Sequence, residues 1–160
     1  MAHRWFDDYN GDDPGALAFL AALNAAVEAD PLPAEPDDAW LLPLGPLLYL
    51  VVAVPALQSL RIGVDLEIGY RPGHPVRAGW GDSEHPLDRQ IVRAELPAGD
   101  PESCAATTLD WLRLQLARPL QRRGWTGSSA YRVVLADTGV VIGGHGRRRL
   151  RRPDLVEPLR

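Results

Sequence analysis

The stretch Ala39–Leu60, AWLLPLGPLLYLVVAVPALQSL, contains no charged residue, so the rest of the chain has to shield it from water. Its length is close to the roughly 20 apolar residues that a membrane-spanning helix needs. Pro43, Pro46 and Pro55 argue against such a helix, because each interior proline removes a backbone hydrogen bond that lipid cannot replace. The next stretch, Leu60–Ile68, is apolar at every even position and charged or glycine at every odd one.

That alternation has the two-residue period of a strand with one buried face. We therefore predict a central hairpin, with Leu47–Val54 as a buried strand, Pro55–Ser59 as a turn and Leu60–Ile68 as the antiparallel partner. Its even residues would face the core. Its odd charged residues would form a row on the exposed side, and we take them as candidate binding residues: Arg61, Asp65 and Glu67.

Two helices are predicted from their start signals. Pro14–Ala29 follows the potential caps Asp12 and Asp13, and a second helix begins with Asp100 and Pro101 and ends before Pro119. The remaining strands are predicted at 75–80, 89–96, 120–125, 131–136 and 140–144. The order α-β-β-β-β-α-β-β-β indicates an α+β fold, in which a largely antiparallel sheet carries both helices on one face.

The chain has 160 residues, a net charge of −4 and one cysteine. We assign residues 1–146 to a single α+β domain and residues 147–160 to an Arg-rich C-terminal tail. Cys104 excludes an internal disulfide and is predicted to be a small buried thiol, and the acidic N-terminus lacks the apolar stretch of a signal peptide. We therefore expect a cytoplasmic protein. All 17 basic residues are arginine, which indicates a GC-rich bacterial genome, so arginine content alone is not a functional signal.

Charge is segregated along the chain. Residues 1–40 hold nine acidic side chains against Arg4, and residues 118–152 hold nine arginines against Asp137. We expect the two segments to attract each other within one domain. The tail is also a candidate for binding an acidic partner, through Arg147, Arg148, Arg149, Arg151 and Arg152.

The densest group of potential ligands and acid–base groups consists of His74, Asp82, Glu84 and His85. Two histidines and a carboxylate can hold Zn²⁺ or Fe²⁺ with open positions. Their spacing matches no metal motif, and the run Gly-Asp-Ser-Glu-His-Pro is also typical of a solvated loop, so we assign no metal. In an enzyme, His85 would be the base, and Asp82 or Glu84 would orient it.

The triplet Asp137-Thr138-Gly139, between two runs of apolar residues, resembles the active-site loop of aspartic proteases. That resemblance implies two such triplets, one from each lobe, whose carboxylates share a proton. This chain has one triplet and 21 residues after it, so we predict a tight hairpin turn with Gly139 at positive φ.

No complete catalytic or cofactor motif is present, so we expect no cofactor. We interpret the chain as a non-enzymatic protein-binding domain of the adaptor, small-chaperone or immunity type. Its partner would be another protein rather than nucleic acid or a membrane. Two alternatives stay open: a small metal-dependent or acid–base enzyme using the region of His74 and His85, and a small-ligand-binding cup between sheet and helices.

Overall fold

The α+β class predicted from the sequence is confirmed by a computed structural model, which describes residues 5–7, 9–81, 90–147 and 151–160. The elements are, in chain order, α1 Pro14–Ala29, η1 Pro36–Asp38, β1 Ala39–Leu44, β2 Leu47–Val52, α2 Pro55–Gln58, β3 Asp65–Tyr70, β4 Val76–Gly81, β5 Val92–Leu96, α3 Pro101–Leu116, β6 Leu120–Gly124, β7 Tyr131–Leu135, β8 Val141–His145 and β9 Leu155–Pro158.

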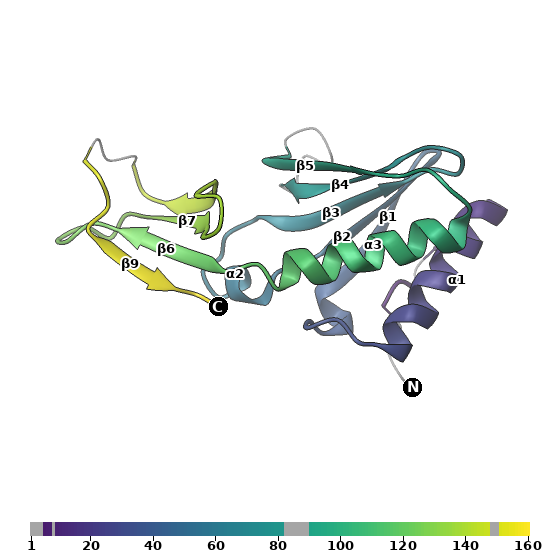
Figure 1. The fold of residues 1–160 in the computed structure, drawn as a ribbon, viewed down its shortest axis with the longest axis horizontal. Coiled ribbons are helices and arrows are strands. Elements are labelled where there is room, and N and C mark those ends of the chain that lie inside the picture. The colour runs from purple at the N-terminus through teal and green to yellow at the C-terminus, as the bar shows by residue number, and fades with distance from the viewer. Residues whose placement is uncertain (1–4, 8, 82–89, 148–150) are drawn as a thin grey trace.

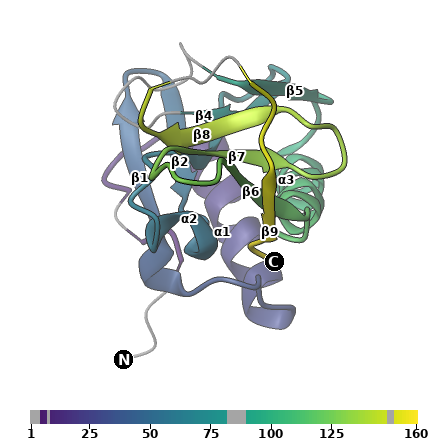
Figure 2. The same ribbon diagram turned by 90° about the vertical axis from the view of Figure 1, so that its left-hand side faces the viewer.

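The strands form two antiparallel sheets rather than one (Figures 1 and 2). The larger sheet has five strands in the order β1-β2-β3-β4-β5, and α1 and α3 pack together against one of its faces. On that face the ring of Tyr70 stacks on Phe19 of α1 with their centroids 4.0 Å apart, and the indole of Trp80 bonds to Gln115 of α3. The hydrophobic core therefore lies between this sheet and the two helices.

Both helices begin where their caps predict. The Asp13 carboxylate accepts the N–H of Ala16 at 2.7 Å, and the Asp100 carboxylate accepts the N–H of Ser103 at 2.8 Å. Each cap pairs with one backbone donor that has no partner inside the helix, and a proline follows at the first helical position. The local signals were therefore sufficient to place both helix starts.

The predicted hairpin is confirmed in part. β2 and β3 are antiparallel neighbours, and Leu66 and Ile68 are fully buried on the helix side. The second strand starts at Asp65, however, and not at Leu60. The reason is α2, whose C-terminal turn places Arg61 at φ 53, with the N–H of Ile62 bonded to the carbonyl of Leu57.

The uncharged stretch supplies one strand more than predicted. Its first residues form β1, which pairs with β2 from Ala39↔Val52 to Leu44↔Leu47 around the turn at Gly45 and Pro46. Gly45 has φ 60, a conformation that glycine adopts without a steric penalty. Pro46 thus lies in the turn between two strands and Pro55 begins a short helix, whereas Pro43 lies within β1. In the described part of the chain, no helix has the length and apolar character needed to cross a bilayer.

The second sheet has the order β8-β7-β6-β9. The meander β6-β7-β8 was predicted, whereas β9 lies in the C-terminal segment that we had interpreted as an Arg-rich tail. Leu155–Pro158 pairs with β6, and the N–H of Leu159 bonds to the carbonyl of Leu120. This part of the C-terminal segment therefore belongs to the fold.

A polar chain links the two sheets at the end of α3. Gln115 accepts the indole N–H of Trp80 at 2.8 Å and a guanidinium N–H of Arg118 at 3.1 Å. Arg118 in turn forms a two-point ion pair with Asp137, at 2.9 and 3.0 Å, in the β7–β8 turn. Arg160 donates to the main-chain carbonyls of Gln115 and Arg118, at 3.0 and 2.9 Å. These bonds satisfy carbonyls at the end of the helix and hold the second sheet against it.

Among the described residues, the basic segment forms its ion pairs with acids of the second sheet and its loops. Arg151 pairs with Asp154 at 3.6 Å, and Arg122 pairs with Glu157 across β6 and β9 at 3.8 Å. Figure 1 shows the second sheet at one end of the long axis and α1 toward the other end. The expected attraction between the two charged ends is therefore not made through these pairs.

Candidate functional site

The five-stranded sheet has a second face, turned away from α1 and α3, which we call the distal face. The register brings Trp40, Leu42 and Leu44 of β1 to this face, next to Leu47 of β2. β1 belongs to the uncharged stretch, yet the side chains of Leu42 and Leu44 are 39% and 40% exposed. One side of the distal face is therefore an apolar strip, which we define as these four residues.

The middle of the distal face contains a buried carboxylate. Glu67 is 0% exposed and accepts a hydrogen bond of 2.6 Å from the hydroxyl of Tyr49, which is also fully buried. Asp65, two residues earlier, is 8% exposed. The predicted exposed row of Arg61, Asp65 and Glu67 is thus wrong, because only Arg61 lies at the surface. The alternation located the two faces of β3 correctly, but β3 is the central strand of the sheet and is buried on both faces.

Two glycines of β4 make room beside this carboxylate. Gly79 lies opposite Glu67, and Gly81 lies opposite Asp65. A Cβ atom on Gly81 would overlap the carboxylate oxygens of Glu67, and one on Gly79 would lie 2.7 Å from the side chain of Gln90. The glycines are therefore needed for close packing rather than for turns.

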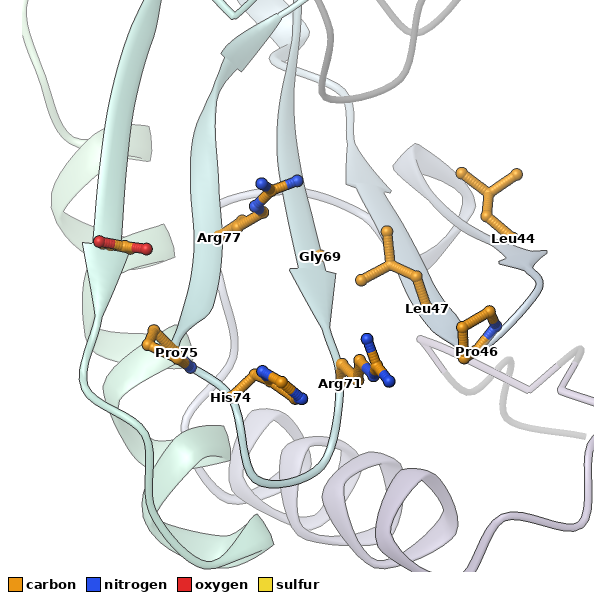
Figure 3. Close-up of a pocket in the computed structure, with 9 residues that line it drawn as sticks. Leu44, Pro46, Leu47, Gly69, Arg71, His74, Pro75 and Arg77 are labelled. Atoms are coloured by element: carbon orange, nitrogen blue, oxygen red, sulfur yellow. The ribbon is translucent and has the colours of Figure 1, made fainter.

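A basic hollow of about 420 Å³ lies at the end of the distal face where β2 begins and β3 ends (Figure 3). Figure 3 shows Arg71 and His74 beside the β3–β4 turn, Arg77 on β4, and Pro46 and Leu47 across from them. Gly69 lies between the two sides, and because it has no side chain, its backbone forms the floor of the hollow. We call this site the basic hollow.

The charges of the basic hollow are exposed and open to a ligand. The guanidinium groups of Arg71 and Arg77 make no hydrogen bond or ion pair with other residues in the described part of the chain. Glu95 lies opposite Arg77 on the neighbouring strand and is the one acid among the lining residues. The two guanidinium groups and the single acid give this cavity a net positive charge, and the imidazole of His74 lies beside them. Such a site suits a carboxylate or another anion.

Among the predicted site residues, His74 lies in the basic hollow. Its expected partners Asp82, Glu84 and His85 lie outside the described residues. Within the described ranges, no three histidine, cysteine or acidic side chains come close enough together to hold a metal ion. Cys104 is buried as predicted, and desolvation raises the pKa of its thiol.

Of the five tail arginines proposed for binding, Arg147, Arg151 and Arg152 are exposed, while Arg148 and Arg149 lie outside the described residues. Arg151 also donates to the carbonyl of Thr126 at 3.1 Å, so part of the tail is anchored to the β6–β7 loop. Asp137-Thr138-Gly139 is the predicted hairpin turn, with Gly139 at φ 72.

Sequence reasoning did not identify Arg71 and Arg77 as site residues. Arg77 is an odd residue in a strand whose even positions are core, so alternation could have placed it on the distal face. Arg71 lies in the β3–β4 turn, where no periodicity applies. No pattern predicts that both converge on Leu47, because that proximity depends on strand order. The chain matches no protein-family model, no curated protein and no solved structure.

Proposed function

We propose that this chain is a protein-binding domain whose basic hollow captures an acidic segment of a partner protein. The observation that supports this is the combination of Arg71, His74 and Arg77 with an exposed apolar strip on the same face. A guanidinium can bind a carboxylate through two parallel hydrogen bonds, which gives direction as well as attraction. A role of the adaptor, small-chaperone or immunity type would use such a contact.

The apolar strip favours a protein segment over a small anion. A free phosphate or carboxylate would use the arginines alone, whereas Leu42, Leu44 and Leu47 offer contacts to apolar side chains beside an acidic one. The net charge of −4 disfavours nucleic acid, whose affinity comes mainly from neutralised phosphates. The preferred partner segment is therefore one in which acidic and apolar residues alternate.

The test measures fluorescence anisotropy of a labelled peptide of alternating glutamate and leucine, with a glutamine–leucine peptide as the uncharged control. We expect the acidic peptide alone to bind at low salt and its affinity to fall as salt is added. Arg77→Glu should weaken binding at least tenfold, because it puts a negative charge in the hollow.

Arg93→Glu is the matched control, since Arg93 is exposed on the same face but does not line the hollow. It makes the same charge change and should leave the affinity within about twofold. Equal weakening by both variants would show that net charge, and not this hollow, attracts the peptide. Tighter binding of a single-stranded RNA than of the acidic peptide would also contradict the proposal.

A further inference from the structure

The two faces of the second sheet differ in what covers them. The register places Leu120, Val133 and Leu135 on one face, and all three belong to the hydrophobic core. Tyr131 shares that face, and its hydroxyl donates to the main-chain carbonyl of Leu60 at 3.4 Å. This face is therefore packed toward the rest of the fold, and we call the opposite one the outer face.

Two arginines lie directly opposite each other in the middle of the outer face. Arg123 of β6 is in register with Arg132 of β7, and these are the two central strands of the sheet. Val156 lies beside Arg123 on β9, and Val141 shares the outer face on β8; they are 58% and 49% exposed. Because like charges in directly opposed positions repel, this arrangement costs stability in the isolated molecule.

The charges of this arginine pair are held in place but not neutralised. Arg123 donates to the side-chain oxygen of Gln121 at 3.2 Å, and Arg132 donates to three main-chain carbonyls at 2.7, 3.0 and 3.2 Å. All of these acceptors are uncharged, and neither guanidinium forms an ion pair with a described acid. Two fixed and uncompensated positive charges beside exposed apolar side chains suit an acidic protein surface.

The complementary charge is at the other end of the same chain. Residues 117–160 hold ten arginines against three acids, whereas residues 1–40 hold nine acids against one arginine. The second sheet lies at one end of the long axis and α1 toward the other, so one molecule keeps the two apart (Figure 1). We call six exposed acids of α1 and its flanking segments the acidic end: Asp7, Asp12, Asp13, Glu28, Glu35 and Asp37.

We propose that the outer face of the second sheet binds the acidic end of a second copy of this chain. Carboxylates of one copy lie against Arg123 and Arg132 of the next, which replaces repulsion between the two arginines with attraction. Val141 and Val156 lose contact with water as the two surfaces close. The association does not involve the basic hollow, which lies on the five-stranded sheet.

The contact is head-to-tail, because it joins two different surfaces of the same molecule. Each bound copy still presents one unused surface, so further copies add until the chain of molecules closes into a ring. A nucleic acid suits the outer face less well, since its phosphates would lie against the exposed valines and the net charge of −4 would repel them.

Sedimentation velocity over a range of protein concentrations tests this association. At roughly 0.01 M salt, where the screening length is about 30 Å, we expect the average mass to rise with concentration. At roughly 1 M salt, where that length is about 3 Å, we expect a monomer. A monomer at every concentration in low salt would overturn the proposal.

Arg123→Glu tests the basic side of the contact. It removes one exposed ion pair and adds one repulsion, so it should weaken association roughly two- to thirtyfold. It also places opposite charges across the pair with Arg132, so Tm measured at high salt should not fall. The matched control Arg93→Glu makes the same charge change on the five-stranded sheet and should leave association unchanged. Equal weakening by both variants would overturn the proposal.

Mixing two variants tests the head-to-tail arrangement. A second variant that carries both Asp7→Arg and Asp12→Arg has an impaired acidic end and an intact outer face. Each variant alone should stay monomeric at concentrations where the wild type associates. Their equimolar mixture should form dimers that grow no further, because each variant supplies the surface that the other lacks. A mixture that remains monomeric would show that these two surfaces are not the ones that meet.

Discussion

Substituting Gly81 by alanine tests whether the distal face is built around the buried carboxylate of Glu67. The added methyl would overlap that carboxylate, whose carbon lies 2.5 Å from the ideal Cβ position. Glu67 is fully buried and hydrogen-bonded to Tyr49 at 2.6 Å, so it cannot swing into solvent without breaking that bond. Either the carboxylate or the strand has to move.

The expected cost follows from two contributions. Overpacking a closely packed site costs about 1–3 kcal/mol. Complete loss of a buried hydrogen bond, which leaves its partner unsatisfied, adds about 1–3 kcal/mol. Because the carboxylate can keep part of that bond, we expect Gly81→Ala to lower the free energy of unfolding by about 2–4 kcal/mol. For a chain of this length, that corresponds to a fall in Tm of roughly 4–16 °C.

Urea denaturation of wild type and Gly81→Ala gives this difference directly. The matched control is Gly63→Ala, because a Cβ atom on Gly63 would meet nothing within 4 Å and its φ is not in the left-handed region. That control should be neutral or stabilise by about 0.4–1 kcal/mol, since it restricts the unfolded chain. The pair therefore separates the effect of overlap from that of losing a glycine.

A double-mutant cycle identifies the cause of the overlap. In a Glu67→Ala background the carboxylate is gone, so Gly81→Ala should cost less than about 0.5 kcal/mol. The same cost in both backgrounds would refute the reasoning, because it would show that the methyl collides with something other than Glu67.

Ile68→Ala removes a fully buried side chain and should lower the free energy of unfolding by about 2–5 kcal/mol in urea, whereas Leu114→Ala, at a site 64% exposed, should change it by less than about 0.5. The hydrogen bonds from Arg118 hold the pKa of Asp137 below its ordinary value of 3.8. Its stabilising effect is therefore present above that value and lost as pH falls through the lower folded pKa, so Tm measured from about pH 5 to about pH 2 should fall less in Asp137→Asn than in wild type. Deleting residues 155–160 removes β9 and the bonds that Arg160 makes, and Tm should fall by a similar amount at low and high salt, because backbone pairing is not screened. A fall seen only at low salt would instead assign the role of this segment to its charges.

The basic hollow could be predicted only in part, because its residues come from separate segments. His74 was recognised as a candidate from its chemistry alone. For Arg77, alternation indicates only the face of β4 on which it lies, and Arg71 lies in a turn without periodicity. Leu47 belongs to a strand that the sequence predicts to be buried. Their convergence depends on β2, β3 and β4 being neighbours in the sheet, which local sequence patterns do not encode.

What the sequence determined by itself was local. Asp13 and Asp100 cap helices because a carboxylate beside the first free N–H groups is favourable wherever it occurs. The alternation around Leu66 and Ile68 identified the core side of β3 because successive side chains of any strand point to opposite faces. These rules depend on backbone geometry and need no knowledge of distant residues.

Only the tertiary structure decided which side chains are exposed to water. Ile62 continues the alternation of β3, yet it lies against Gly143 of the second sheet, because α2 and its terminal turn redirect the chain. Glutamate is usually a surface residue, yet Glu67 is buried, where Tyr49 supplies a hydrogen bond and Gly81 supplies the space. Periodicity states which residues share a face, whereas burial depends on what packs on that face, and those neighbours are far away in the sequence.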